Sequence, residues 1–200
     1  MCKEICPESG EKIWAQKAFR QGAAHFAAYR YWDALPLFRQ AAQAGHPQAM
    51  RCLGWFLENG YCVPADVDQA ARWYAAASEA GDGLASGCLA VLWDGVTADF
   101  PTDYREAFRL YRLSIAQGGA TGTTYNNLAV LYMNGTGTES DPAMAERLLR
   151  KAMSLGNPLA GSNLEVLADS LSPFRCPRCG SLDIRRGRAC LCRGCGLIFP

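Results

Sequence analysis

Near the end of this 200-residue sequence, four cysteines stand in two pairs, each spaced Cys-x-x-Cys and each followed by a glycine. The first pair is Cys176 and Cys179, and the second pair is Cys192 and Cys195. The short loop within each pair lets two sulfurs point at one centre, and four thiolates at about 2.3 Å complete the tetrahedral shell of a zinc ion. Because such a shell leaves no open position for water or substrate, we expect a structural Zn²⁺ ion here.

The segment that carries these cysteines, residues 174–200, resembles a zinc ribbon. Between the two pairs, the chain alternates in polarity on either side of Arg186 and Gly187, as a short β-hairpin does. Chains below roughly 40 residues usually need a metal or a disulfide to fold, because their hydrophobic burial is too small. The resemblance therefore implies a small β zinc ribbon whose metal contributes to its folding.

Three alternatives remain open for these cysteines. The pairs could form a disulfide or a redox pair, and the stretch CPRCG also resembles the metal-binding knuckle of rubredoxin, so iron could stand in place of zinc. Cys190 lies two residues before Cys192 and could replace one ligand. The two matching Cys-x-x-Cys-Gly halves favour Cys192 and Cys195, which leaves Cys190 as a spare thiol.

The positive charge of the chain is concentrated in the same segment. Residues 174–200 carry six arginines and one acidic residue, a net charge of +5, whereas the rest of the chain carries a net charge of −4. A basic surface attracts nucleic-acid phosphates or an acidic protein, although many basic surfaces are only solvated. The candidate contacts for such a partner are Arg185, Arg186 and Arg188.

Upstream of the cysteines, the chain repeats itself. Four segments end in a glycine, at Gly45, Gly81, Gly118 and Gly156, with intervals of 36, 37 and 38 residues. Before each glycine, the eleventh residue is alanine, the seventh is large, and the fourth is small. Residues spaced by three and four share one face of a helix, so the pattern predicts a helix before each glycine. The large residues are Phe38, Tyr74, Tyr111 and Leu149.

A second helix is expected after each of these glycines, which suit the left-handed end of the first. These second helices carry corresponding leucines at Leu53, Leu89, Leu128 and Leu164. A helix hairpin cannot bury its apolar face alone, so we expect the hairpins to stack on one another as a solenoid.

Residues 31–168 resemble Sel1-like repeats, which are relatives of the tetratricopeptide repeat, in stretches such as AMRCLGWFLENG and YNNLAVLYMNG. Ala90 and Thr124 depart from the small or glycine positions of that repeat. The resemblance implies an all-α fold: a right-handed α-α superhelical solenoid of helix hairpins, whose concave face is lined by the first helix of each pair.

Three regions follow from these two resemblances. They are an N-terminal tail at residues 1–10, a helical repeat domain at residues 11–171, and the four-cysteine zinc ribbon at residues 174–200.

The resemblance also implies a function, since solenoids of this kind hold other proteins together and are not usually enzymes. We therefore expect a scaffold that binds a protein or peptide. Asparagines on a concave surface can pair with the backbone of an extended peptide. In the alternative interpretation, Trp55 and Val91 are core residues and the asparagines cap helices or face solvent. The candidate contacts are Arg51, Trp55, Val91, Asn126, Asn127 and Val130.

A second function, from a different class, is a nucleic-acid-associated regulator in which the basic ribbon contacts DNA or RNA while the repeats recruit a protein. An enzyme is not expected, because the sequence has only two histidines and lacks a phosphate loop, a nucleophile elbow and a His-Glu-x-x-His motif.

The opening stretch MCKEICPESGEK is polar, and no run of about 18 apolar residues follows, so we expect a cytoplasmic protein with reduced thiols and no membrane partner. Cys52, Cys62 and Cys88 are expected as buried small apolar residues. Cys2 and Cys6 are a weak candidate for a metal or redox pair.

Overall fold

The computed structural model describes residues 7–95 and 100–171, together with three short strands at residues 184–185, 190–192 and 198–199. The helices are α1 (Pro7–Ala27), α2 (Tyr31–Gln43), α3 (Pro47–Asn59), α4 (Val67–Glu79), α5 (Gly83–Trp93), α6 (Tyr104–Ala116), α7 (Gly122–Asn134), α8 (Pro142–Ser154) and α9 (Ala160–Leu171). The first four residues of α1 belong to the segment that we assigned to the N-terminal tail.

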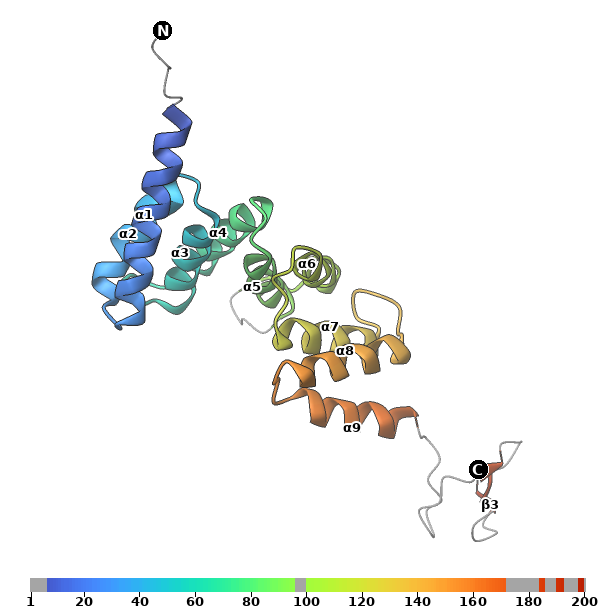
Figure 1. The fold of residues 1–200 in the computed structure, drawn as a ribbon. Coiled ribbons are helices and arrows are strands. Elements are labelled where there is room, and N and C mark those ends of the chain that lie inside the picture. Colours follow the sequence, from blue (N-terminus) through green and yellow to red (C-terminus); the bar gives the residue numbers. More distant parts are fainter. Residues whose placement is uncertain (1–6, 96–99, 172–183, 186–189, 193–197, 200) are drawn as a thin grey trace.

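The helices pair as antiparallel neighbours along the chain, α1 with α2, α3 with α4, α5 with α6, and α7 with α8. Each hairpin then packs on the next, and α9 packs on α8 as the first helix of a further pair (Figure 1). The expected repeat solenoid of stacked helix hairpins is therefore confirmed for the helical region. Within the described residues, no helix is both long enough and apolar enough to cross a membrane.

The starts of these helices are set by short polar side chains. The carboxylates of Asp66, Asp82, Asp103 and Asp141 each accept a hydrogen bond from a backbone N–H group in the first turn of α4, α5, α6 and α8. This N-terminal cap satisfies donors that the helix itself leaves unpaired. Thr121 does the same for α7 through a reciprocal capping box with Thr124.

The ends of the helices before each repeat glycine follow the prediction. Gly45, Gly81, Gly118 and Gly156 all have a positive φ, between 74° and 91°, which a residue with a side chain adopts only with strain. At these glycines the chain reverses and enters the next helix. The predicted junction between helices is therefore confirmed in all four repeats.

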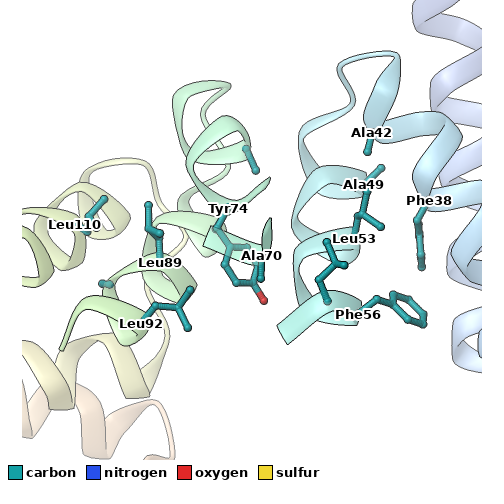
Figure 2. Packing of buried hydrophobic residues seen from close by; sticks show 14 of the residues in the cluster. Phe38, Ala42, Ala49, Leu53, Phe56, Ala70, Tyr74, Leu89, Leu92 and Leu110 are labelled. Carbon is teal, nitrogen blue, oxygen red and sulfur yellow. The ribbon is translucent and has the colours of Figure 1, made fainter. Parts of the chain in front are cut away.

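The core is built from the repeated pattern. The four large residues Phe38, Tyr74, Tyr111 and Leu149 are at most 1% exposed, and the alanine four residues before each of them is fully buried. Figure 2 shows how Phe38, Leu53 and Phe56 fill the space between neighbouring helices. The alanines let the helices approach closely, and the large residues fill the space that remains.

Glycine and alanine also make room for the large residues from the partner helix. A Cβ atom on Gly54 of α3 would lie 2.8 Å from the ring of Tyr74, so only glycine fits beside this ring without a shift. The two departures from the repeat, Ala90 and Thr124, are both buried in the same packing, at 0% and 4% exposure. They change the side chains at the interface and leave the helix pairing intact.

Three short strands follow the helices: β1 (Ile184–Arg185), β2 (Cys190–Cys192) and β3 (Ile198–Phe199). They form an antiparallel sheet in the order β1-β2-β3. Ile184 lies opposite Cys192 in the first pair of strands, and Cys190 lies opposite Phe199 in the second.

Candidate protein-binding face

The helices that follow the repeat glycines, α3, α5, α7 and α9, line one side of the helical stack. The sequence predicted them as the second helices of their pairs, whereas in the structure α3, α5 and α7 are each the first helix of a hairpin. Helix α3 contacts α5, and α7 contacts α9, although α4 and α8 lie between them in the sequence. We call the helices α4, α6 and α8 the outer layer. We call the surface formed by α3, α5, α7 and α9 the inner face. Residues at the same repeat position form rows across it, and the row two residues after each repeated leucine consists of Trp55, Val91, Val130 and Val166.

A small cavity of about 200 Å³ lies on the inner face between α5 and α7. Leu84, Cys88 and Val91 of α5 line one side of it, and Thr123 of α7 lines the other. Val91 is only half-buried, so it contacts the core and is also accessible from this cavity. The alternative interpretation of Val91 as a core residue is thus true for part of its surface only.

A second cavity, of about 300 Å³, lies where α5 and α7 end. Asn127 and Val130, two of the predicted contacts, line it together with Asp94 and Asn134. The amide of Asn127 donates to the hydroxyl of Tyr111 over 3.0 Å, and this hydroxyl donates to the Asp94 carboxylate over 2.5 Å.

The tyrosine hydroxyls under the inner face form a repeated polar feature. Tyr74 donates to the Glu58 carboxylate over 2.6 Å, as Tyr111 does to Asp94 one hairpin later. Burial raises the pKa of Tyr74 and of Tyr111, and the neighbouring carboxylates raise it further. Both hydroxyls therefore stay protonated as donors, and they fix the position of an acid at the end of α3 and of α5.

Trp55 lies in an aromatic cluster at the N-terminal part of the inner face. Its ring stacks on Tyr61 with centroids 5.1 Å apart, and it also contacts Phe26 and Tyr31. Tyr61 is 46% exposed, so the cluster is open to solvent on one side. Trp55 itself is half-buried, in contact with the core as well as with this surface.

Arg51 and Asn126 lie at joints between hairpins. The guanidinium of Arg51 forms an ion pair of 3.0 Å with Asp82, the residue that caps α5. Burial opposes the charge of Arg51, but the attraction of Asp82 wins and raises the pKa of the guanidinium. Asn126 is 3% exposed and accepts a hydrogen bond of 2.8 Å from Asn163 of α9. Its amide is thus used inside the fold, where it neither caps a helix nor faces solvent as the alternative interpretation of the asparagines expected.

Five residues that line the second cavity were not among the predicted contacts: Asp94, Tyr104, Leu131, Asn134 and Thr136. A signal for Asp94 was present, because a buried tyrosine hydroxyl needs a partner. Tyr111 was identified as a core residue, and an acid at the end of the preceding helix is the nearest acceptor of that kind along the repeat.

The three cysteines expected as buried apolar residues are only partly buried, and Cys62 lies in the loop between α3 and α4. Cys52 and Cys88 are half-buried, pack against the core and are free thiols. Burial raises the pKa of the Cys52 thiol, and it raises the pKa of Cys88 to about 11. A thiol with a raised pKa is a poor nucleophile at neutral pH, so neither cysteine is activated for chemistry. Cys62 is half-buried as well, with a positive φ of 61°.

The predicted metal ligands lie almost entirely outside the described residues. Cys176, Cys179 and Cys195 are not described, and of Cys192 only the backbone is described, in β2. Among the residues that are described, no group of three or more His, Cys, Asp and Glu side chains is arranged to hold a metal ion.

Most of the other residues predicted to act at the two ends of the chain also lie outside the described residues. Arg185 lies in β1, whereas Arg186 and Arg188 are outside the described residues, as are Cys2 and Cys6. The roles of these residues stay predictions.

Comparison with known proteins bears on the helical region. The family model described as Sel1 repeat matches residues 47–82, 89–119 and 124–157, which together make up half of the chain. These ranges contain α3, α4, α6 and α8 in full, together with the second half of α5 and all but the first two residues of α7. No curated protein matches the sequence.

Two solved structures are similar to this one. One is a protective antigen present in uropathogenic Escherichia coli strains and displaying an SLR fold, with 27% identity, a TM-score of 0.68, and coverage of 78% of this chain and 34% of the antigen. The other is a Sel1 repeat protein from Oxalobacter formigenes, with 22% identity, a TM-score of 0.64, and coverage of 75% and 62%. The chain thus spans about a third of the first relative and less than two thirds of the second.

Proposed function

The chain belongs to the Sel1 repeat family, and from this premise we propose that it is a protein-interaction scaffold that binds an extended segment of a partner protein on its inner face. The observation that carries the proposal is the pair of adjacent cavities, of about 200 and 300 Å³, between α5 and α7. Three of the residues that the sequence singled out, Val91, Asn127 and Val130, line them.

The composition of this face suits an extended peptide. Apolar side chains such as Leu84 and Val91 offer contact area, while Thr123 and Asn134 offer hydrogen-bonding groups at its edges. An extended backbone needs both donors and acceptors, and an amide side chain supplies each. The proposed role involves binding and no catalytic step.

The proposal is tested by a matched pair of exposed apolar residues. Leu84 lies on the inner face and is 39% exposed, whereas Met153 lies on α8 of the outer layer and is 47% exposed. We expect the full-length chain and Met153→Arg to capture the same partner from an extract of cells that contain the protein, and Leu84→Arg to lose it. Capture by Leu84→Arg at the level of the unchanged chain would contradict a binding site on the inner face.

We also propose that Cys176, Cys179, Cys192 and Cys195 hold one structural Zn²⁺ ion in the C-terminal ribbon. The support lies in the donor set, because four thiolates in two Cys-x-x-Cys pairs suit zinc. The antiparallel pairing of β1 with β2 and of β2 with β3 is compatible with a ribbon held by such an ion. The ion would supply folding energy to the ribbon and no chemistry.

Elemental analysis of freshly purified, reduced protein tests this second proposal. We expect about one zinc per chain, with loss of the metal in Cys176→Ser and retention in Cys52→Ser, a matched thiol of the helical domain. Iron at the same stoichiometry would support the rubredoxin-like alternative, and absence of any metal would refute the site.

A further inference from the structure

The cavity at the ends of α5 and α7 differs from the rest of the inner face in its charge. Its volume of about 300 Å³ is larger than any single amino-acid side chain. Asp94 is the only charged residue among the described residues that line it; the other lining groups include Tyr104, Asn127, Val130 and Asn134. The cavity therefore combines one negative group with neutral polar and apolar walls.

The carboxylate of Asp94 is held in a fixed position. The hydroxyl of Tyr111, which is completely buried, donates to Oδ2 of Asp94 over 2.5 Å, and Asn127 holds the same hydroxyl from the other side over 3.0 Å. Burial raises the pKa of Asp94 while the bond from Tyr111 lowers it, and burial has the larger effect. The charged carboxylate is thus incompletely compensated within the fold.

Two helix ends add to the negative potential of this cavity. Asp94 caps the end of α5, and Asn134 is the last residue of α7 before Gly135. The carbonyl groups at the C-terminus of a helix carry about half a negative charge, which attracts a cation within the last turn. The carboxylate and both helix ends therefore favour the same kind of ligand.

The walls of the cavity suit the stem of a long side chain. Val130 and Leu131 of α7 are apolar residues that line it, and Tyr104 and Thr136 line it as well. Lysine and arginine bury their methylene stems along apolar surface and leave only the charged head to be paired. A short cation would leave these walls without contact.

We propose that this cavity receives one lysine or arginine side chain of the bound partner segment, with Asp94 as its counter-ion. The inference rests on the proposed function, because the segment must lie along the inner face for its side chain to enter here. Val91 and Leu84 of the neighbouring cavity then contact an apolar side chain of the same segment.

The test begins with selection of peptides from a library of random linear 12-residue sequences displayed on phage, against the full-length protein. We expect the enriched sequences to share one lysine or arginine at a fixed distance from an apolar residue. Replacing this basic residue by norleucine should weaken binding about 10-fold, a typical loss for a partly buried charge pair.

Three variants assign the charge to the cavity. Asp94→Asn keeps the acceptor for Tyr111 and removes the charge, so it should bind the basic peptide about 10-fold more weakly and the norleucine peptide unchanged. Asn134→Lys places a positive charge beside the cavity at the C-terminus of α7, a position where a helix tolerates a cation. This variant should also bind the basic peptide about 10-fold more weakly. Asp68→Asn, which removes an exposed acid on α4, is the matched control and should bind as the unchanged chain does.

The outcomes separate this inference from the function on which it rests. Enriched peptides without a fixed basic residue, or equal binding of the basic peptide to the unchanged chain and to Asp94→Asn, would overturn the inference and leave a peptide-binding inner face. No enrichment at all would overturn both.

Discussion

At the same repeat position, the two central hairpins carry Tyr74 and Tyr111, whereas the first and last complete hairpins carry Phe38 and Leu149. All four side chains are buried to the same degree. Only the tyrosines have a hydroxyl, and each donates it to an acid at the end of a helix of the inner face, Glu58 or Asp94. At this repeat position, the two central hairpins thus have a buried hydroxyl that the first and last hairpins lack.

The packing of the hairpins requires only a large side chain at this position, whereas a polar site needs the hydroxyl that the two tyrosines carry. The pattern of small and large residues fixes how the hairpins pack, and it accepts phenylalanine, tyrosine or leucine at its large position. The hydroxyl adds nothing to the packing pattern, but it fixes an acid at the end of α3 or α5, and the acid at the end of α5 lines a cavity. The repeats are therefore equivalent in packing and unequal in chemistry.

The largest effects should come from truncation of the large residue itself. We expect Tyr111→Ala to lower the free energy of unfolding by about 3–5 kcal/mol and Leu149→Ala by about 2–5 kcal/mol, because each leaves a cavity in a packed core. Tyr111→Ala should exceed Leu149→Ala, since it also leaves the carboxylate of Asp94 without a donor. Chemical denaturation measures both, and a larger loss for Leu149→Ala would break the distinction between central and terminal hairpins.

A smaller effect is expected where backbones meet in the central hairpins. A Cβ atom on Gly119 would lie 2.1 Å from the backbone of Gly83, so Gly119→Ala must displace the turn before α7. We expect a loss of about 1–3 kcal/mol in the free energy of unfolding. Gly161→Ala in α9, where a Cβ atom meets nothing within 4 Å, should instead gain about 0.5–1 kcal/mol. Thermal unfolding of the two variants would show shifts of opposite sign.

Removal of the hydroxyls alone should cost less. Tyr74→Phe and Tyr111→Phe keep the ring in the core and remove one hydrogen bond to a carboxylate, which we expect to lower the free energy of unfolding by about 1–2 kcal/mol. Tyr125→Phe is the control, because its hydroxyl has no hydrogen bond among the described residues, and it should stay within about 0.5 kcal/mol of the unchanged chain. Equal stability of all three variants would show that the hydroxyls of Tyr74 and Tyr111 do not contribute to the stability of the central hairpins.

The smallest effect is expected at the joint between the first hairpin and α3. His46 caps α3 by accepting from the N–H of Ala49 at Nδ1, and its other ring nitrogen bonds Gln16 of α1 over 2.9 Å. Burial lowers the pKa of His46, although its own backbone and Asp82 oppose this. The neutral ring is the form that can accept at Nδ1, so protonation removes the cap.

Stability should therefore depend on pH in a defined direction. Above pH 6.5 the ring is neutral in both the folded and the unfolded chain, and its contribution is complete. As the pH falls below 6.5, the unfolded chain binds the proton first, and stability falls until the lowered pKa of the folded state is passed. His46→Asn, which caps without titrating, should lose this part of the pH dependence in denaturation at pH 7 and pH 5. An unchanged profile in His46→Asn would show that the cap does not contribute.

At the joints between hairpins, the sequence predicted the apolar contacts and did not predict the polar ones. The apolar contacts at each joint repeat and were predicted from the alanine and leucine positions. The side chains that make the polar contacts differ from joint to joint: His46 with Gln16, Arg51 with Asp82, and Asn126 with Asn163. These contacts join residues 30, 31 and 37 positions apart, and because the residue types change from joint to joint, the alanine and leucine pattern does not indicate which side chains meet.

The sequence by itself determined the helical hairpins, their ends and their core, because helix periodicity, capping residues and left-handed glycines act within a few neighbouring residues. It could not determine which polar side chains are used inside the fold. Asn126 and Asn127 are neighbours of the same type, yet one is buried against α9 and the other lines a cavity. Only the stacking of hairpins decided this, since burial and hydrogen-bond partners depend on which helices meet, and it also placed Asp94 beside α7 at the candidate site.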